Sequence, residues 1–249
     1  MDLVAAIALQ LAYVIANLAL ISLGLAIIFG MMRVINLAHG EFLMLGGYTV
    51  VVATNAGVNI WVAMLILAPL VVGIIGVIVE RLLIRWLYGR MVDTLLATWG
   101  LSLLLVGLVT SIFGASTATT KLGLLARGTM QNAEMASSLG VSTSRIYMIT
   151  FGLGAAVSGL AGGLLAPMTG GLPTIGATYI AKAFITVISG GAAILAGTTA
   201  GSILLGGLNG IFSFIAGSTF GEIALLIAAI LLLRLMPRGI TGRFFRKSL

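Results

Sequence analysis

The chain has 249 residues, of which 60% are apolar and only 8% carry a charged side chain, and its mean hydropathy is +1.23. This composition excludes an ordinary soluble globular domain. The formal net charge of +7 is concentrated in a few basic patches, which is typical of the cytoplasmic loops of membrane proteins and argues against a nucleic-acid partner. The sequence therefore predicts an all-α, polytopic membrane helical bundle surrounded by membrane lipids.

Apolar runs long enough to cross a hydrocarbon core of about 30 Å recur along the chain. The second run is short and contains Gly46 and Gly47, so it is expected to be tilted or broken and to contact protein rather than lipid. The whole chain, 1–249, is predicted to form one domain. In chain order, the predicted spans are residues 3–32, 41–56, 60–79, 94–113, 147–168, 177–194, 198–216 and 221–236.

Lysine and arginine predict the orientation of the chain, because they are concentrated in cytoplasmic loops. The tail that begins at Arg238 is basic, so the C-terminus is expected in the cytoplasm. The N-terminus carries only Asp2 and is expected outside. Loops 80–93 and 114–146 are both basic, and both are expected in the cytoplasm although a single predicted span separates them. Either that span is re-entrant, or one crossing is missing near residues 114–121.

Small residues recur at spacings that favour close packing of membrane helices. Gly159 and Gly163, and also Gly197 and Gly201, are four residues apart and lie on one face of their helices. In a membrane, such faces let two backbones approach closely. We therefore predict tight helix pairs at both places.

The sequence contains none of the motifs expected of an enzyme. No lysine follows a glycine, so there is no phosphate-binding loop for ATP. His39 is the only histidine and cysteine is absent, which excludes a metal site built on these residue types and a cysteine nucleophile. We predict no catalytic residue, no metal and no bound cofactor in this chain.

The basic loop contains a short helix pattern over Gln131 to Leu139, followed by Gly140 as a helix stop. Composition leaves two interpretations open, a docking element for a partner or a helix lying on the bilayer. The segment "EMASSLG" resembles the EAA loop of ABC importer permeases. Glu134, Ala136 and Gly140 match that loop, and Met135 replaces its first alanine.

Other segments occur in the order found in the LivH-type permeases of branched-chain amino acid ABC importers, a family that includes urea and short-amide importers. The resemblance covers nearly the whole chain, and its most specific part is the pattern N-x-x-H-G-E. The matching segments are "GLAIIFGMMRVINLAHGEFLMLGGY", "ERLLIRWLYGR", "DTLLATWGLSLLL", "RGTMQNAEMASSLGVSTSRIYMITFGLGAAVSGLAGGLLAP" and "YIAKAFITVISGG".

The resemblance implies a transporter subunit in a bacterial plasma (inner) membrane. Its implied partners are a second permease (the M-type subunit or a homologous copy), two cytoplasmic ABC ATPases that bind the ATP, and a periplasmic or lipid-anchored solute-binding protein. It also implies that the loop 121–146 couples the ATPases to the spans. For this coupling the resemblance indicates Gln131, Glu134, Met135, Ala136 and Gly140.

The chain departs from this family after "IFG", where members normally carry several dozen additional residues that include a membrane span. This gap coincides with the crossing that the charge distribution indicates as missing. Three explanations stay open: a segment removed from the sequence, a natural or engineered deletion, or a re-entrant arrangement. If the span is truly absent, the transport competence of the chain is in doubt.

Polar residues near or within the spans are candidates for the solute pathway or its gate. Asn36, His39, Gly40 and Glu41 are predicted to fall in the turn that starts the second helix, as a structural brace or as direct solute contacts. Lys182 either meets a substrate carboxylate or extends its ammonium to the outer interface.

The last span contributes one acidic residue, Glu222, which is expected near the outer surface, facing water or the solute-binding protein. The predicted function is the translocation pathway for branched-chain amino acids or a related small polar solute. The alternatives are a urea or short-amide permease and, from another class, an ATP-independent channel or secondary transporter. The sequence does not distinguish leucine from urea.

Overall fold

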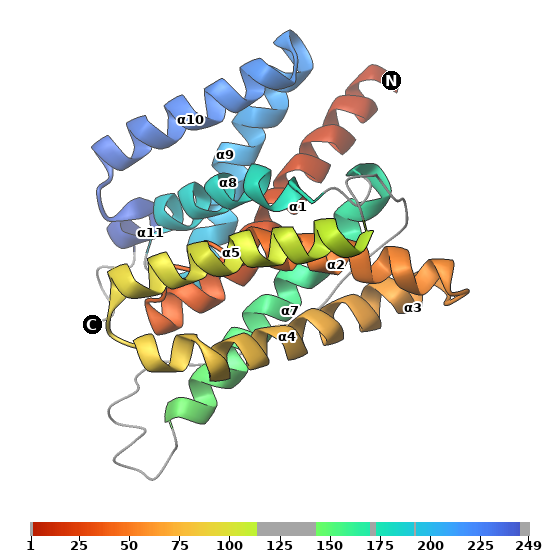
Figure 1. Cartoon of the computed structure of the whole chain (residues 1–249). Helices are drawn as coiled ribbons and strands as arrows, with labels where there is room; N and C mark the ends of the chain where they lie inside the picture. Colours follow the sequence, from red (N-terminus) through yellow and green to blue (C-terminus); the bar gives the residue numbers. More distant parts are fainter. Residues whose placement is uncertain (1, 114–142, 170–172, 192, 245–249) are drawn as a thin grey trace. The chain divides into compact units, whose positions relative to one another are not determined.

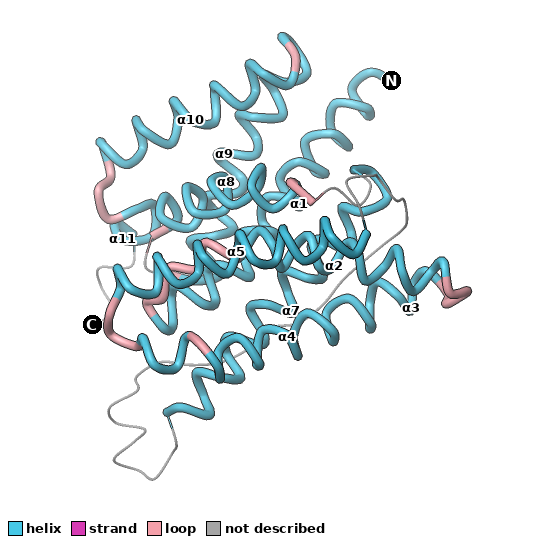
Figure 2. The backbone as a smooth tube through the Cα atoms, in the orientation of Figure 1, coloured by secondary structure: helices cyan, strands magenta, loops and turns pink. Residues whose placement is uncertain are grey.

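The computed structural model describes residues 2–113, 143–169, 173–191 and 193–244, and these are helical throughout apart from short connections, with no strand (Figure 2). The loop 114–142, with all five predicted coupling residues and the site of the missing crossing, lies outside the described residues. The helices, drawn in Figure 1, are α1 (Asp2–Met32), α2 (His39–Asn55), α3 (Ile60–Val62), α4 (Ala68–Leu82), α5 (Met91–Phe113), α7 (Thr143–Thr169), α8 (Ile175–Gly190), α9 (Ile194–Ala216), α10 (Ser218–Leu235) and α11 (Gly239–Phe244).

Each predicted span corresponds to a helical segment of the described chain. Six of these are long and apolar enough to cross a membrane, whereas α2 and α8 are shorter, with 17 and 16 residues. The predicted polytopic bundle is confirmed. Helix α2 is short as expected but unbroken, and most of its residues are buried against other helices, so it contacts protein rather than lipid.

The third span is continuous from Ile60 to Leu82 but contains a π-helical stretch, Ala63–Leu67, between α3 and α4. Pro69 is the second residue of α4, two positions after this stretch ends. A proline inside a helix donates no backbone hydrogen bond, and its ring clashes with the carbonyl four residues earlier. The wider π-helical turn lets the chain pass this proline without breaking the span.

The chain divides into two compact units, which we call the central unit (Ile27–Ile180) and the terminal unit (Met1–Ala26 with Ala181–Leu249). The core of the central unit is apolar and lies where α4, α7 and the start of α2 meet. Phe42 of α2 and Phe151 of α7, both fully buried, make an edge-to-face ring contact there with 6.0 Å between centroids. The terminal unit has its own core, in which Leu18 and Leu205 pack with residues of α10.

Glycine brings α2 and α7 into backbone contact within the central unit. A Cβ atom added to Gly46 would overlap the carbonyl of Gly159, and one added to Gly162 would overlap the carbonyl of Leu43. In the terminal unit, Gly197 faces the backbone of α8 in the same way. The predicted close approach at Gly159 and Gly197 is therefore confirmed, and it extends to partners that their own spacing does not identify.

Candidate functional site

The candidate site is built in the central unit, on the connection between α1 and α2. Helix α1 ends at Met32, and Arg33 then adopts a positive φ of 52°, which turns the chain. The following residues run through the protein interior, where their backbone groups need partners. Thr98 of α5 provides them: its hydroxyl oxygen accepts a 3.0 Å hydrogen bond from the Leu37 N–H and lies 3.1 Å from the Ile35 carbonyl oxygen.

His39 is the first residue of α2 and is completely buried. Its Nδ1 lies 3.0 Å from Oγ of Ser158 on α7. The Ser158 hydroxyl donates its own hydrogen to the Gly154 carbonyl at 2.8 Å. The tautomer of the His39 ring decides which of the two atoms donates in the bond between His39 and Ser158. This bond joins the start of α2 to the middle of α7.

Glu41, in the first turn of α2, is buried with 3% exposure. One carboxylate oxygen, Oε1, accepts a 2.7 Å hydrogen bond from the Ser102 hydroxyl of α5. The other, Oε2, has no hydrogen-bond partner among the described residues, and the same is true of the buried Asn36 amide nitrogen. Asn36 does use its side-chain oxygen, which accepts a 3.0 Å bond from the Ala38 N–H.

Gly40 completes this group of residues by allowing the start of α8 to pack against α2. A Cβ at Gly40 would overlap the Gly176 carbonyl, and a Cβ at Gly176 would lie 2.5 Å from Oε2 of Glu41. The structure therefore brings together the four residues predicted at the start of the second helix. Asn36 lies just before the turn at residues 37–38, whereas His39, Gly40 and Glu41 are the first residues of α2 rather than part of the turn. We call this group, Asn36 with His39, Gly40 and Glu41, the α2 cluster.

The partners of the α2 cluster were not identified from the sequence. They are Thr98 on α5, which bonds the backbone of the connection that contains Asn36, Ser102 on α5, which bonds Glu41, and Ser158 on α7, which bonds His39. The sequence does contain a pattern that points to Thr98 and Ser102. Together with Thr94 they are spaced four residues apart, which places three hydroxyls along one face of an apolar helix. Ser158, a single serine among small residues, carried no comparable signal.

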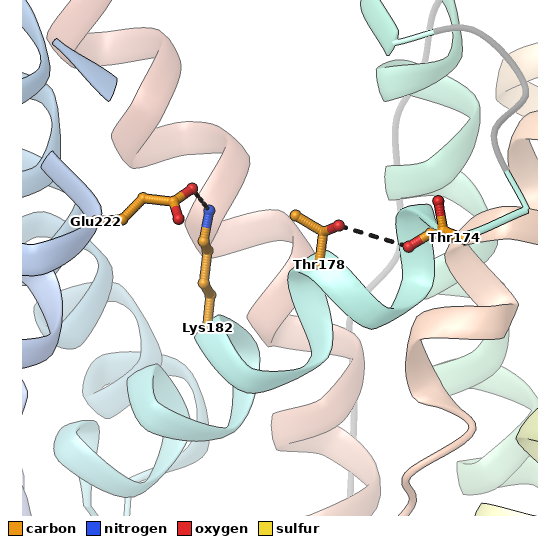
Figure 3. A network of polar contacts seen from close by, with 4 residues as sticks. All are labelled: Thr174, Thr178, Lys182 and Glu222. Carbon is orange, nitrogen blue, oxygen red and sulfur yellow. Dashed lines mark hydrogen bonds and ion pairs between the residues drawn. The ribbon is translucent and has the colours of Figure 1, made fainter. Parts of the chain in front are cut away.

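Lys182 belongs to the terminal unit and is not part of the α2 cluster. Its Nζ lies 2.6 Å from Oε1 of Glu222 on α10, so the two charges that the sequence placed in separate spans form an ion pair (Figure 3). The side chains are 21% and 52% exposed, respectively. The pairing could not be read from the sequence, because nothing in it shows that α8 and α10 bring these positions together.

A second polar group in the central unit lies at the end of α4. Glu80 is completely buried and accepts a hydrogen bond from the Tyr88 hydroxyl, and Arg85 lies 3.6 Å from its other oxygen. Burial, and then the bond to Glu80, raise the pKa of Tyr88 above its ordinary value. The Tyr88 ring also packs on Tyr147 of α7, with 5.0 Å between centroids. This group ties the start of α7 to the connection that follows α4.

The arrangement of the α2 cluster suits positioning rather than chemical catalysis. Its hydrogen bonds run from α2 to α5 and α7, and its residues are packed against neighbouring backbone. Buried polar networks of this kind hold helices in one relative arrangement, because each broken bond leaves a polar group without a partner.

Comparison with known proteins identifies one family over most of the chain. A family model described as "Branched-chain amino acid transport system / permease component" matches two overlapping stretches, residues 7–119 and 108–236. The high-affinity branched-chain amino acid transport system permease protein LivH of Salmonella typhimurium is 26% identical, and that of Escherichia coli K12 is 27% identical. Each match covers 90% of this chain and 91% of the relative. No solved structure matches the chain.

The alignments to these relatives are longer than the chain itself. Each extends over 283 residues, whereas the chain has 249. The relatives therefore contain residues that have no counterpart here, as the family resemblance led us to expect.

Proposed function

The chain belongs to the family of permease components of branched-chain amino acid transport systems, and from this we propose that it forms the translocation pathway of a binding-protein-dependent ABC importer for branched-chain amino acids. The observation that carries the proposal is the family match, which together covers residues 7 to 236. The apolar spans and the packed α2 cluster agree with it, because a permease needs a fixed helical framework around its pathway.

The proposed importer contains further subunits. A second permease, of the M-type or a homologous copy, forms the other half of the pathway. Two cytoplasmic ATPases bind and hydrolyse ATP, for which this chain has no phosphate-binding loop. A periplasmic or lipid-anchored protein delivers the solute. The basic C-terminal tail supports a cytoplasmic C-terminus in the bacterial inner membrane, with the N-terminus in the periplasm.

We place the coupling to the ATPases at Gln131, Glu134, Met135, Ala136 and Gly140. Helix α7 begins at Thr143, shortly after these residues, and it carries Ser158, which bonds His39. At 1.5 Å per residue, about 22 Å of helix joins Thr143 to Ser158. A displacement of the coupling segment therefore reaches the α2 cluster through one continuous helix.

The proposal is tested by reconstituting the complete transporter in liposomes and measuring leucine uptake and ATP hydrolysis together. Uptake should require the ATPase subunits and ATP. Glu134→Arg and Gly140→Leu variants should hydrolyse ATP while losing most leucine uptake, because the coupling segment no longer transmits the ATPase motion. Leucine uptake that persists without ATPases would favour a channel or secondary transporter and overturn the proposal. Substrate-stimulated ATPase activity and uptake that are both unchanged in the variants would remove the coupling role.

A further inference from the structure

The Lys182–Glu222 ion pair joins two charged residues that lie within spans, where this chain carries few charges. Lys182 is the only lysine among the described residues. It is the eighth residue of α8, about 10 Å from the start of that helix at 1.5 Å per residue. Glu222 is the fifth residue of α10, a helix apolar enough to cross a membrane. Both charges thus lie within helices that are otherwise almost entirely apolar.

The pair is not buried as a structural ion pair in a core would be. The Glu222 side chain is 52% exposed and the Lys182 side chain 21% exposed. Charged groups within membrane helices are costly in contact with lipid, and they normally face the interior of an assembly or a water-filled cavity. The partial exposure therefore indicates that this side of the terminal unit faces water or another subunit rather than lipid tails.

The polar character continues along α8. Thr178, Lys182 and Thr186 are four residues apart, so they lie on one face of the helix. The Thr186 hydroxyl donates a 2.7 Å bond to the Lys182 carbonyl. The Thr178 hydroxyl lies 3.5 Å from the Thr174 carbonyl (Figure 3). Each hydroxyl is thus satisfied by its own backbone, which leaves the ammonium and carboxylate as the groups able to select a solute by charge.

We propose that Lys182 and Glu222 bind the charged end of a zwitterionic amino acid during its passage. The α-carboxylate of the solute pairs with the Lys182 ammonium, and its α-ammonium pairs with the Glu222 carboxylate. Two new ion pairs replace the one that is broken, so the exchange leaves no charge without a partner. This inference rests on the proposed importer function and deepens it by naming the residues that recognise the two charges of its substrate.

The same charges disfavour a neutral solute. Urea or a short amide offers hydrogen-bonding groups but no full charge, so it cannot replace the charge that either side chain loses when the pair opens. A solute with only one charge compensates only one of the two side chains. The pair therefore selects amino acids over neutral amides, a distinction that the sequence alone did not provide.

The test measures binding of radiolabelled leucine, without ATP, to the complex of permeases and ATPases in lipid nanodiscs, with the solute-binding protein left out because it binds leucine itself. The Lys182→Met/Glu222→Gln double variant removes both charges while keeping similar side-chain volumes. We expect its leucine affinity to fall about ten-fold or more, since each lost charge-assisted contact contributes substantially to binding. The matched control is Arg90→Met/Asp93→Asn, which removes another exposed ion pair, on the connection that leads into α5. The control should bind leucine like the parent.

Competition experiments identify the charges that are recognised. Leucinamide lacks the carboxylate, 4-methylpentanoate lacks the ammonium, and urea lacks both charges. Each should compete with leucine at least ten-fold more weakly than unlabelled leucine does in the parent transporter. In the double variant, leucine should lose its advantage over leucinamide and 4-methylpentanoate.

The outcomes separate this inference from the proposed function. If the parent imports leucine with ATP and the double variant binds and imports leucine normally, the ion pair is only structural and the inference is overturned. If the complete parent transporter imports no leucine at all, the proposed function fails instead. A thermal unfolding curve of the double variant close to that of the parent shows that a loss of affinity does not come from misfolding, because removing both partners of an ion pair is often close to neutral.

Discussion

At the scale of single residues, the sequence located the α2 cluster correctly but not its partners. The polar pattern N-x-x-H-G-E in an apolar chain was sufficient to predict a turn at the start of the second helix, and the structure has it there. The bonds to Ser102 and Ser158 depend on which helices pack together over more than 60 residues of sequence. Helical periodicity within one span does not contain that information.

The backbone conformation of Arg33 could not be predicted from the sequence either. Its φ of 52° lies in the left-handed region that usually favours glycine. The basic side chain at the end of the first span was predicted, but the conformation was not. A non-glycine residue holds this conformation at a cost of about 1–2 kcal/mol when the surrounding contacts require it. The backbone that follows Arg33 is held by Thr98, which bonds the Leu37 N–H and the Ile35 carbonyl.

The first prediction at this scale concerns His39. Replacing it by alanine removes the bond to Ser158 and leaves a cavity in the buried cluster, so the protein should lose about 1–3 kcal/mol of stability and most of its uptake. Thermal unfolding in detergent and uptake by the reconstituted transporter measure the two effects.

Thr49→Val is a suitable control for this experiment. Its hydroxyl lies on the same helix but donates to the Leu45 carbonyl of α2 itself. Its stability should therefore stay close to that of the parent. A His39→Ala variant with full uptake and parental stability would exclude both the bracing role and a direct role in solute contact.

At the scale of helices, hydropathy predicted the positions of the spans well, because about 20 apolar residues are needed to cross a bilayer whatever the fold. The π-helical stretch Ala63–Leu67 was not predicted, since it reflects how the chain adapts to Pro69 rather than any apolar periodicity. The close packing at Gly159 was predicted from spacing, but its partner Gly46 was visible only in the structure.

The prediction for helix packing compares two glycine substitutions. Gly46→Ala should destabilise the protein by about 1–3 kcal/mol, because the added methyl group overlaps the Gly159 carbonyl and forces α2 away from α7. Gly107→Ala on α5 has nothing within 4 Å of its new methyl group and should be neutral or stabilising by up to about 1 kcal/mol. Thermal unfolding in the same detergent compares the two. Equal stability of both variants would contradict the close packing of α2 and α7.

At the scale of the whole molecule, the sequence predicted one permease domain, and the family match spans most of the chain. The division into two units was not predicted, because helix α8 passes from one unit to the other without any change in composition. The charge distribution also left the direction of the chain after the fourth predicted span unresolved. In the structure this span, α5, is an unbroken helix of 23 residues, long enough to cross the membrane.

The side of the membrane on which α5 ends decides whether the coupling segment can reach cytoplasmic ATPases. The chain has no cysteine, so single cysteines can be labelled without background. In right-side-out membrane vesicles, an impermeant thiol reagent should reach both Trp86→Cys and Ser116→Cys only after permeabilisation, because the basic loops on both sides of α5 are expected in the cytoplasm. Ala56→Cys, which follows α2 and is expected outside, is the positive control. Labelling of Ser116→Cys in sealed vesicles would show that α5 crosses the membrane and would contradict a cytoplasmic coupling segment.

The backbone contact between α2 and α7 also limits where a solute can travel. Carbonyl groups of one helix occupy the space that a single methyl group would need on the other. An amino acid is much larger than a methyl group, and two helices held by such contacts do not open between them without losing their packing along the whole length. The solute pathway therefore runs along an outer face of this helix pair and does not pass between α2 and α7.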